Sequence, residues 1–209
     1  MKHAKLIVTS IILLATLPLF FFEIACNQTS TAQQPDSTAA PKELSNAEKI
    51  MRGKYLMTIG SCGDCHTPKI FTAAGPVPDT TKLYSGHPGS TPLLPIDKKV
   101  LQPANWALIA PDLTAFVGPF GISYASNLTP DSATGLGAWS EDTFVKTLRT
   151  GRHLGQDGGR QILPPMPWYF IGQATDEDLK SIYTYLRAIP PISNKVPAPV
   201  SPPDLAKMK

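Results

Sequence analysis

The chain has 209 residues, of which 42% are hydrophobic and 17% charged, and its formal net charge is +3. This length suits one folded domain with flanking segments, and this composition excludes a disordered chain. The small net charge argues against a nucleic-acid-binding surface. The 22 prolines stop helices and remove backbone hydrogen-bond donors, so we expect short helices, long stiff loops and few strands.

Residues 1–25 have the pattern of an export signal. Lys2 and Lys5 precede the uncharged, apolar run 6–22, and small residues lie close behind it. A basic segment followed by an apolar segment and small residues is typical of a secretory signal. We therefore expect the rest of the chain to lie outside the cytoplasm.

Cys26 is a candidate lipid anchor. Ala25 before Cys26 resembles the cleavage box of bacterial lipoproteins, although Glu23 departs from that box. Lipidation would hold the protein at the periplasmic face of a bacterial membrane. An uncleaved anchor helix is an alternative, because the apolar run reaches the short end of the roughly 17–25 residues that span a bilayer. Soluble export is another.

Residues 26–45 are polar, contain Pro35 and Pro41 and show no hydrophobic period. This composition predicts a flexible tether that holds a domain near the membrane. We expect the folded domain to cover residues 46–192 and the proline-rich residues 193–209 to form a loose tail.

The folded part begins with a helix signal. Ser45 and Glu48 have the spacing of a capping box, and the predicted helix runs to about Ile59. Small or apolar residues recur along it at helical intervals, at Ile50, Gly53 and Met57. The following segment 68–138 is rich in proline and glycine, which predicts a long wrapping loop with one short helix near residues 105–109.

Two further helices follow this loop. Ser140 is an expected N-cap and Gly151 an expected C-terminal stop. The last helix is expected to start at Thr175 and to end before Pro190. Its apolar stripe has the spacing i, i+3, i+4 and i+7, at Leu179, Ile182, Tyr183 and Leu186. We therefore expect this stripe to face the core.

The segment Cys62-Gly63-Asp64-Cys65-His66 is a C-x-x-C-H motif, the pattern of haem c attachment. Two thiols on one turn can each add to one vinyl group of the same porphyrin. The imidazole of His66 then lies under the ring, where it can bind the iron as proximal ligand. The motif predicts one covalent haem c, and export agrees with it because this attachment takes place outside the cytoplasm.

Two other interpretations of the cysteine pair are open. A thioredoxin-like redox pair also uses C-x-x-C, but it follows a strand in a βαβ setting, and no such pattern precedes Cys62. A zinc site needs a second pair of ligands with finger-like spacing, which the sequence lacks. Haem attachment is the favoured interpretation.

A carrier cytochrome needs a sixth iron ligand, and Met166 is the preferred candidate. It lies in Leu163-Pro164-Pro165-Met166-Pro167-Trp168, where three prolines make a stiff loop that holds a weak thioether ligand in place. Met166 could instead fill a gap in the core, as methionine often does. The remaining candidates are less favourable and comprise Met51, Met57, Met208, His87 and His153.

Some residues are candidates to support the cofactor without binding the iron. Arg149, Arg152 and Arg160 are candidates to pair with haem propionates. The carbonyl group of Pro76 could accept a hydrogen bond from the His66 ring, which would fix the orientation of the ligand.

Several segments together resemble class I cytochromes c. They are Arg52-Gly53-Lys54-Tyr55-Leu56, Asn127-Leu128-Thr129-Pro130-Asp131, Gly135-Leu136-Gly137-Ala138-Trp139-Ser140 and the segment around Met166. The resemblance covers about residues 46–192 and is strongest to the haem modules in cytochrome subunits of membrane-bound alcohol and aldehyde dehydrogenases. Those subunits often carry three haems, whereas this chain has one C-x-x-C-H motif.

The resemblance implies an all-α cytochrome c fold, with the first and last helices crossing near Gly53 and residues 183–186. It also implies Met166 as distal ligand and delivery of electrons from a dehydrogenase toward a terminal oxidase. The expected function is a single-haem electron carrier whose partners are a dehydrogenase, a terminal oxidase or another cytochrome. The alternatives are a haem enzyme, such as a peroxidase or small-molecule oxidase with an open sixth position, and a haem-based gas sensor.

Overall fold

The computed structural model describes residues 43–208. Contacts divide the chain into residues 1–42 and residues 43–209. The expected export signal, most of the tether and the Cys26 anchor lie outside the described residues. Within residues 43–208, no helix combines the length and apolar character needed to cross a membrane.

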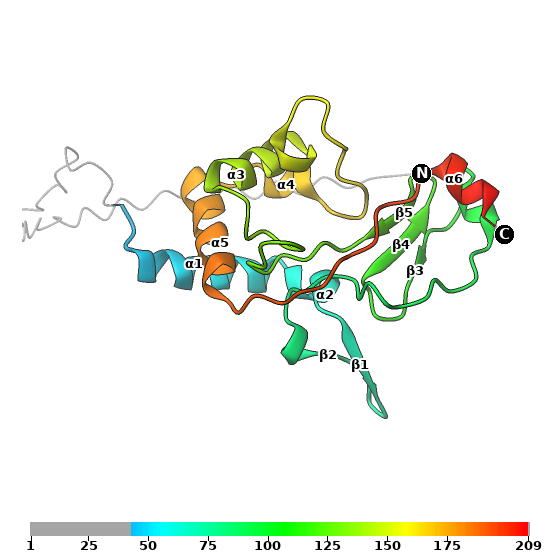
Figure 1. Cartoon of the computed structure of the whole chain (residues 1–209), viewed down its shortest axis with the longest axis horizontal. Coiled ribbons are helices and arrows are strands. Elements are labelled where there is room, and N and C mark those ends of the chain that lie inside the picture. The colour runs from blue at the N-terminus through cyan, green and yellow to red at the C-terminus, as the bar shows by residue number, and fades with distance from the viewer. Residues whose placement is uncertain (1–42, 209) are drawn as a thin grey trace, which may run out of the picture. The chain divides into compact units, whose positions relative to one another are not determined.

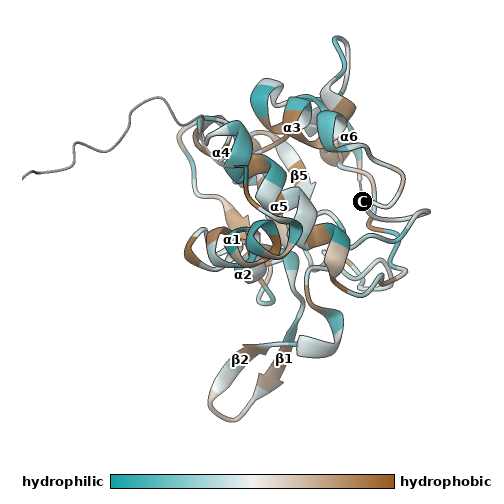
Figure 2. Cartoon of the chain, turned by 90° about the vertical axis from the view of Figure 1, so that its left-hand side faces the viewer, coloured by the Kyte–Doolittle hydropathy of each residue, from teal (hydrophilic) through white to brown (hydrophobic). Residues whose placement is uncertain are grey.

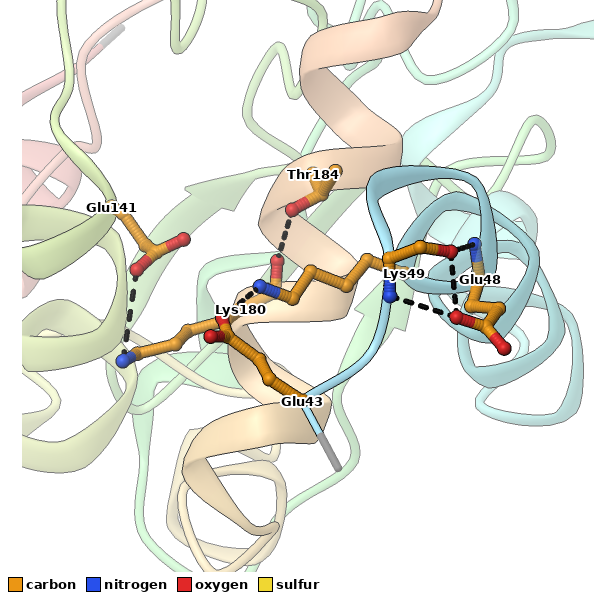
Figure 3. Close-up of polar contacts among 7 residues, drawn as sticks. Glu43, Glu48, Lys49, Glu141, Lys180 and Thr184 are labelled. Carbon is orange, nitrogen blue, oxygen red and sulfur yellow. Dashed lines mark hydrogen bonds and ion pairs between the residues drawn. The ribbon is translucent and has the colours of Figure 1, made fainter. Parts of the chain in front are cut away.

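Helix α1 (Asn46–Ile59) begins with the predicted capping box. The Glu48 amide donates to the Ser45 hydroxyl oxygen at 3.3 Å, and the Ser45 amide donates to the Glu48 carboxylate at 2.8 Å. Figure 3 shows Glu48 in the first turn of the helix. Two of the backbone donors that a helix N-terminus leaves free are thereby satisfied, which confirms the predicted start.

Helix α5 (Asp176–Ala188) crosses α1, as Figure 1 shows. The crossing point is Gly53, where a Cβ atom would collide with the Ser181 carbonyl group and lie 2.7 Å from the Tyr185 Cβ atom. Only glycine allows the two backbones to approach so closely. The expected crossing of the first and last helices of residues 46–192 is therefore present.

Ion pairs join the ends of these helices to their neighbours. Arg52 on α1 donates to the Asp178 carboxylate on α5 at 2.8 Å. Lys49 pairs with Glu43 at 2.7 Å, and Lys180 on α5 lies 3.8 Å from Glu141 (Figure 3). Lys49 and Asp178 are partly buried and the other four groups are more exposed, so each pair is expected to stabilise the fold only modestly.

Helices α3 (Glu141–Thr150) and α4 (Trp168–Ile171) complete the helical core. Ser140 caps α3 as predicted, and Gly151 ends it in the left-handed conformation with φ of 66°. The buried side chains of this first core cluster come mainly from α1, α3 and α5; they are Met57, Tyr84, Leu136, Phe144, Leu148, Leu179, Ile182, Tyr185 and Leu186. The predicted stripe of the last helix thus faces the core.

The segment between helix α2 (Cys62–His66) and α3 contains two small antiparallel sheets, so an all-α class is only partly right. Strands β1 (Lys69–Thr72) and β2 (Gly75–Pro78) form a hairpin that projects from the remaining elements in Figures 1 and 2. Strands β3 (Leu108–Ile109), β4 (Ala115–Gly118) and β5 (Gly121–Tyr124) form the second sheet. The prolines of β2 are tolerated because both strands of a two-stranded sheet are edges.

The short helix expected near residues 105–109 is absent from the described structure, since Leu108 and Ile109 form strand β3. Short 3-10 helices occur earlier in this segment, at Thr80–Lys82 and Lys98–Leu101. Pairing with β4 through Ile109 and Phe116 outweighs the local helix tendency, as tertiary context often does.

The prediction of a loose tail is wrong. Val200 pairs with Ile122 of β5, and helix α6 (Pro202–Lys207) follows directly. Leu205 on α6 is 1% exposed and joins a second core cluster with Val100, Ala115, Val117, Ile122 and Tyr124. Ser201 caps α6 and Pro202 opens it, where proline costs no hydrogen bond. The tail therefore covers the second sheet.

Candidate haem-attachment site

The C-x-x-C-H motif forms the single-turn helix α2 (Cys62–His66), which follows α1 after a tight turn. Ser61 makes this turn in the left-handed conformation with φ of 51°. Gly63 faces the Tyr84 ring, at 3.6 Å from the position that a Cβ atom would take. The helix thus packs closely on the core while both cysteines remain at its surface.

Both thiols of the motif are free and only partly buried. Cys62 packs against the first core cluster, and burial raises the pKa of its thiol. Burial and the nearby Asp64 carboxylate raise the pKa of Cys65, whereas Lys69 lowers it. Thiols that are reduced, partly accessible and on one turn fit covalent attachment to a single planar group.

His66 is 8% exposed, and its Nδ1 atom lies 2.7 Å from the Ser126 carbonyl oxygen. A carbonyl oxygen only accepts hydrogen bonds, so Nδ1 carries the proton and Nε2 keeps its lone pair. Burial lowers the pKa of His66, an effect that the Ser126 carbonyl partly opposes. The ring is therefore held neutral and in the tautomer that binds a metal through Nε2.

The acceptor for His66 is Ser126 and not Pro76, the expected partner. Pro76 lies on β2 of the projecting hairpin, opposite Phe71. A backbone acceptor can come from any residue that the fold brings near the ring, so no residue type marks it in the sequence. Ser126 directly precedes Asn127-Leu128-Thr129-Pro130-Asp131, one of the segments that resemble class I cytochromes c, but that resemblance did not indicate this role.

Asn127 fixes the segment that carries the acceptor. It is 3% exposed, and its side-chain oxygen accepts from the Thr129 amide at 2.9 Å. Its Nδ2 atom donates to the Ile192 carbonyl oxygen at 2.8 Å and to the Thr134 hydroxyl at 3.1 Å. One buried side chain therefore joins three segments beside the Ser126 carbonyl group.

Met166 and Cys62 pack against the same core cluster. Met166 is partly buried, and its amide lies 3.3 Å from the Leu163 carbonyl oxygen in the proline-rich loop before α4. The fold thus brings residues from the motif and from this loop to one apolar region. Thioether ligation by Met166 stays a prediction.

The arginine candidates differ in how strongly the protein engages them. Arg149 donates to Asp176 at 2.6 Å and also to the Gly172 carbonyl group. Arg152 and Arg160 donate only to backbone carbonyl oxygens near them in the chain, at 3.3 and 3.4 Å, among the described residues. Arg149 therefore holds α3 against α5, and the other two arginines are the better candidates for propionates.

The two other histidines of residues 43–208 occupy different surroundings. The His153 ring is exposed and stacks edge-on against Trp139, with ring centres 5.6 Å apart. His87 is 3% exposed, and its Nδ1 atom lies 2.7 Å from the Thr114 hydroxyl group. His87 is thus part of the buried packing beside the second sheet.

The residues present fit a covalent haem c. The set consists of two free thiols on one turn, a buried imidazole with its Nε2 lone pair available and a methionine that contacts the same apolar cluster. Hard oxygen ligands are absent from this set, which suits iron in a porphyrin better than magnesium or calcium. Among residues 43–208, no cluster of three or more histidine, cysteine or acidic side chains forms another metal site.

No protein-family model matches the chain. A nicotinate dehydrogenase subunit from Pseudomonas putida is 36% identical over 153 residues, which are 73% of this chain and 10% of the relative. The cytochrome c subunit of gluconate 2-dehydrogenase from Pantoea cypripedii is 28% identical over 169 residues, which are 78% of this chain and 30% of the relative.

The cytochrome c subunit of the quinone alcohol dehydrogenase from Gluconacetobacter polyoxogenes is 31% identical over 161 residues, 73% of this chain and 28% of the relative. The chain therefore spans between about a tenth and a third of the length of these relatives. A cytochrome subunit transfers electrons and does not itself catalyse a dehydrogenation, which agrees with the prediction of an electron-transfer component. Over about three quarters of its length, this chain is related to the cytochrome c subunits of alcohol and gluconate dehydrogenases, which confirms the resemblance seen in its motifs.

Proposed function

We propose that this protein is a single-haem c-type cytochrome that transfers electrons in an exported respiratory or dehydrogenase-linked chain. The observation that carries the proposal is the geometry of His66 within its motif. Its Nδ1 proton is committed to the Ser126 carbonyl oxygen, so Nε2 is free to bind iron on the same turn as two free thiols.

Each residue of the motif has one part in this proposal. Cys62 and Cys65 would hold the haem through thioether bonds, since an S–H group can add across each vinyl C=C bond with no leaving group. His66 and Met166 would hold the iron. The bound haem supplies a one-electron couple, and the protein sets its potential through the ligands and their burial.

The partners and location form a further part of the proposal. The relatives are named as subunits of dehydrogenases, so a dehydrogenase is the proposed electron donor, and a terminal oxidase or another cytochrome is the proposed acceptor. An export signal and a lipid on Cys26 would place the domain at the periplasmic face of a membrane. Mass spectrometry of the mature N-terminus tests this location. Cleavage before Cys26 would remove the mass of residues 1–25, and lipidation of Cys26 would add the mass of the lipid.

The first experiment is to produce the full chain in a host that matures c-type cytochromes. Haem should stay with the polypeptide on a denaturing gel and give the pyridine haemochrome spectrum of two thioether bonds, with one iron per chain. Cys62→Ala and Cys65→Ala should each shift that spectrum toward the spectrum of a haem with one thioether bond and one intact vinyl group. The double variant should lose the haem. A wild-type chain without covalent haem would overturn the proposal.

The second experiment distinguishes a carrier from a haem enzyme. The visible spectrum of the reduced protein is recorded with and without carbon monoxide. An unchanged spectrum means that both axial positions are held by the protein, as a carrier requires. A clear shift would favour the peroxidase or oxidase alternative, because such chemistry needs an open or displaceable sixth position.

A further inference from the structure

Lys69 caps the helix that carries the haem-binding motif. Its Nζ atom donates to the Asp64 carbonyl oxygen at 2.6 Å and to the Thr67 carbonyl oxygen at 2.7 Å. These two carbonyl groups belong to the residues on either side of Cys65 and His66. The ammonium group therefore lies against the backbone of the iron ligand's own turn.

The fold holds Lys69 in this position. It is the first residue of β1 and pairs with Pro78 at the base of the hairpin, and the Asp79 amide donates to the neighbouring Pro68 carbonyl oxygen at 2.8 Å. Lys69 is partly buried, and no carboxylate of residues 43–208 lies within ion-pairing distance of it. Its charge is therefore directed at α2 and is not cancelled by an acid.

The geometry places this charge where a group bound to the turn would feel it. The carbonyl ends of a helix carry partial negative charge, and the ammonium group donates to two carbonyl oxygens at the C-terminal end of α2. A cation held against this turn disfavours any added positive charge on a group bound there.

We propose that Lys69 is a positioning residue that raises the reduction potential of the haem held by α2. The inference rests on the proposed function and concerns the same site. Ferric haem carries one more positive charge than ferrous haem, so a fixed cation beside the ligand turn disfavours the ferric form. The same hydrogen bonds keep the turn, and thus the His66 ring, in place.

Asp64 acts in the opposite sense. Its carboxylate is exposed and belongs to the same helical turn as Cys65 and His66. Solvent screens an exposed charge more than a partly buried one, so Lys69 is expected to have the larger influence. Neutralising Asp64 should therefore raise the potential by less than neutralising Lys69 lowers it.

The test is a potentiometric titration of the purified haem-loaded full chain and four variants. Lys69→Gln removes the charge and keeps a hydrogen-bond donor, and Lys69→Arg keeps the charge. Lys82→Gln is the matched control, because Lys82 is an exposed cation that pairs with Asp79 at 3.4 Å. Asp64→Asn supplies the change of opposite sign.

Lys69→Gln should lower the equilibrium constant for reduction between about threefold and tenfold, and tenfold equals about 59 mV for one electron. Lys69→Arg and Lys82→Gln should stay close to wild type, and Asp64→Asn should raise the potential. An unchanged potential in Lys69→Gln, or an equal shift in Lys82→Gln, would refute the role of Lys69. If Lys69→Gln fails to accumulate, Lys69→Met, which also removes the charge, replaces it, and an unchanged potential in that variant refutes the role of Lys69.

The outcomes separate this inference from the function on which it rests. Wild-type protein without covalent haem overturns the proposed function and this inference with it. If the wild-type protein carries covalent haem but all variants have the wild-type reduction potential, only the proposed role of Lys69 is overturned. The carbon monoxide response of each variant shows whether both axial ligands are retained. A shift in potential that is accompanied by carbon monoxide binding comes from ligand loss and not from the charge of Lys69.

Discussion

The His66 Nδ1 atom lies 2.7 Å from the Ser126 carbonyl oxygen, across 60 residues of sequence. This contact determines which ring nitrogen carries the proton and so which one is free to bind iron. Its acceptor is backbone, and its position depends on the buried Asn127 side chain next to it. The orientation of the proposed iron ligand is therefore controlled from a distant loop.

Asn127→Ala should lower the free energy of unfolding by about 2–4 kcal/mol, because buried donors and acceptors of three segments lose their partner. Denaturant unfolding of the haem-loaded protein measures this loss. Asn105→Ala is the matched control, since Asn105 is exposed, and it should cost far less. Equal stabilities of the two variants would show that Asn127 does not organise the site.

Met166→Ala should lower the reduction potential and allow carbon monoxide to bind the reduced protein. The reason is that a methionine ligand raises the potential and closes the sixth position. Met51→Ala is the control, because Met51 is 64% exposed on α1. If the potential of Met166→Ala equals that of wild type, Met166 is a core residue and not a ligand.

Gly53→Ala should cost about 3 kcal/mol or more, because the new methyl group collides with the Ser181 carbonyl group on α5. Lys54→Ala, at the exposed neighbouring position on α1, should change stability by no more than about 0.5 kcal/mol. Chemical denaturation of both variants measures the difference. A stable Gly53→Ala protein would mean that α1 and α5 do not cross at this residue.

Leu205→Ala should lower stability by about 2–5 kcal/mol, as expected for a leucine removed from a closed core. Leu205 is 1% exposed, whereas Met208 is 40% exposed, so Met208→Ala should have a much smaller effect. The visible spectrum of Leu205→Ala should remain that of wild type, since its cluster is separate from the one that contacts Cys62 and Met166. If Leu205→Ala leaves the Tm unchanged, residues 193–209 form a loose tail after all.

The Arg52–Asp178 pair predicts an acid-dependent part of the stability. The Arg52 guanidinium holds the pKa of the Asp178 carboxyl group below its ordinary value, and burial partly opposes this. A carboxyl group with a lowered pKa in the folded state stabilises the protein above its ordinary pKa of about 3.9. That contribution is lost as the pH falls through the folded-state pKa.

Asp178→Asn should therefore have a lower Tm than wild type near neutral pH, and the difference should shrink as the pH falls below about 4. Thermal melts from about pH 7 to about pH 3 measure it. Asp157→Asn, at an exposed position, should follow the wild-type curve. A difference in Tm that stays constant with pH would mean that the pair does not contribute through its charge.

Local sequence signals determined the helices and the proposed attachment motif. The capping box at Ser45, the cap at Ser140 and the stop at Gly151 all lie where the sequence predicted them. Each of these signals acts within about one helical turn, because a cap satisfies the free amides of its own helix. The C-x-x-C-H motif is local for a similar reason, since its three side chains share one turn.

The tertiary structure alone decided how distant segments complete the site and the fold. Ser126 rather than Pro76 accepts from His66, Lys69 reaches back to α2, and the tail pairs with β5. Backbone carbonyl groups are the same in every residue, so the sequence cannot show which one will lie beside a given donor. Those contacts depend on burial and chain path across tens of residues, and they appear only when the whole domain has closed around its core.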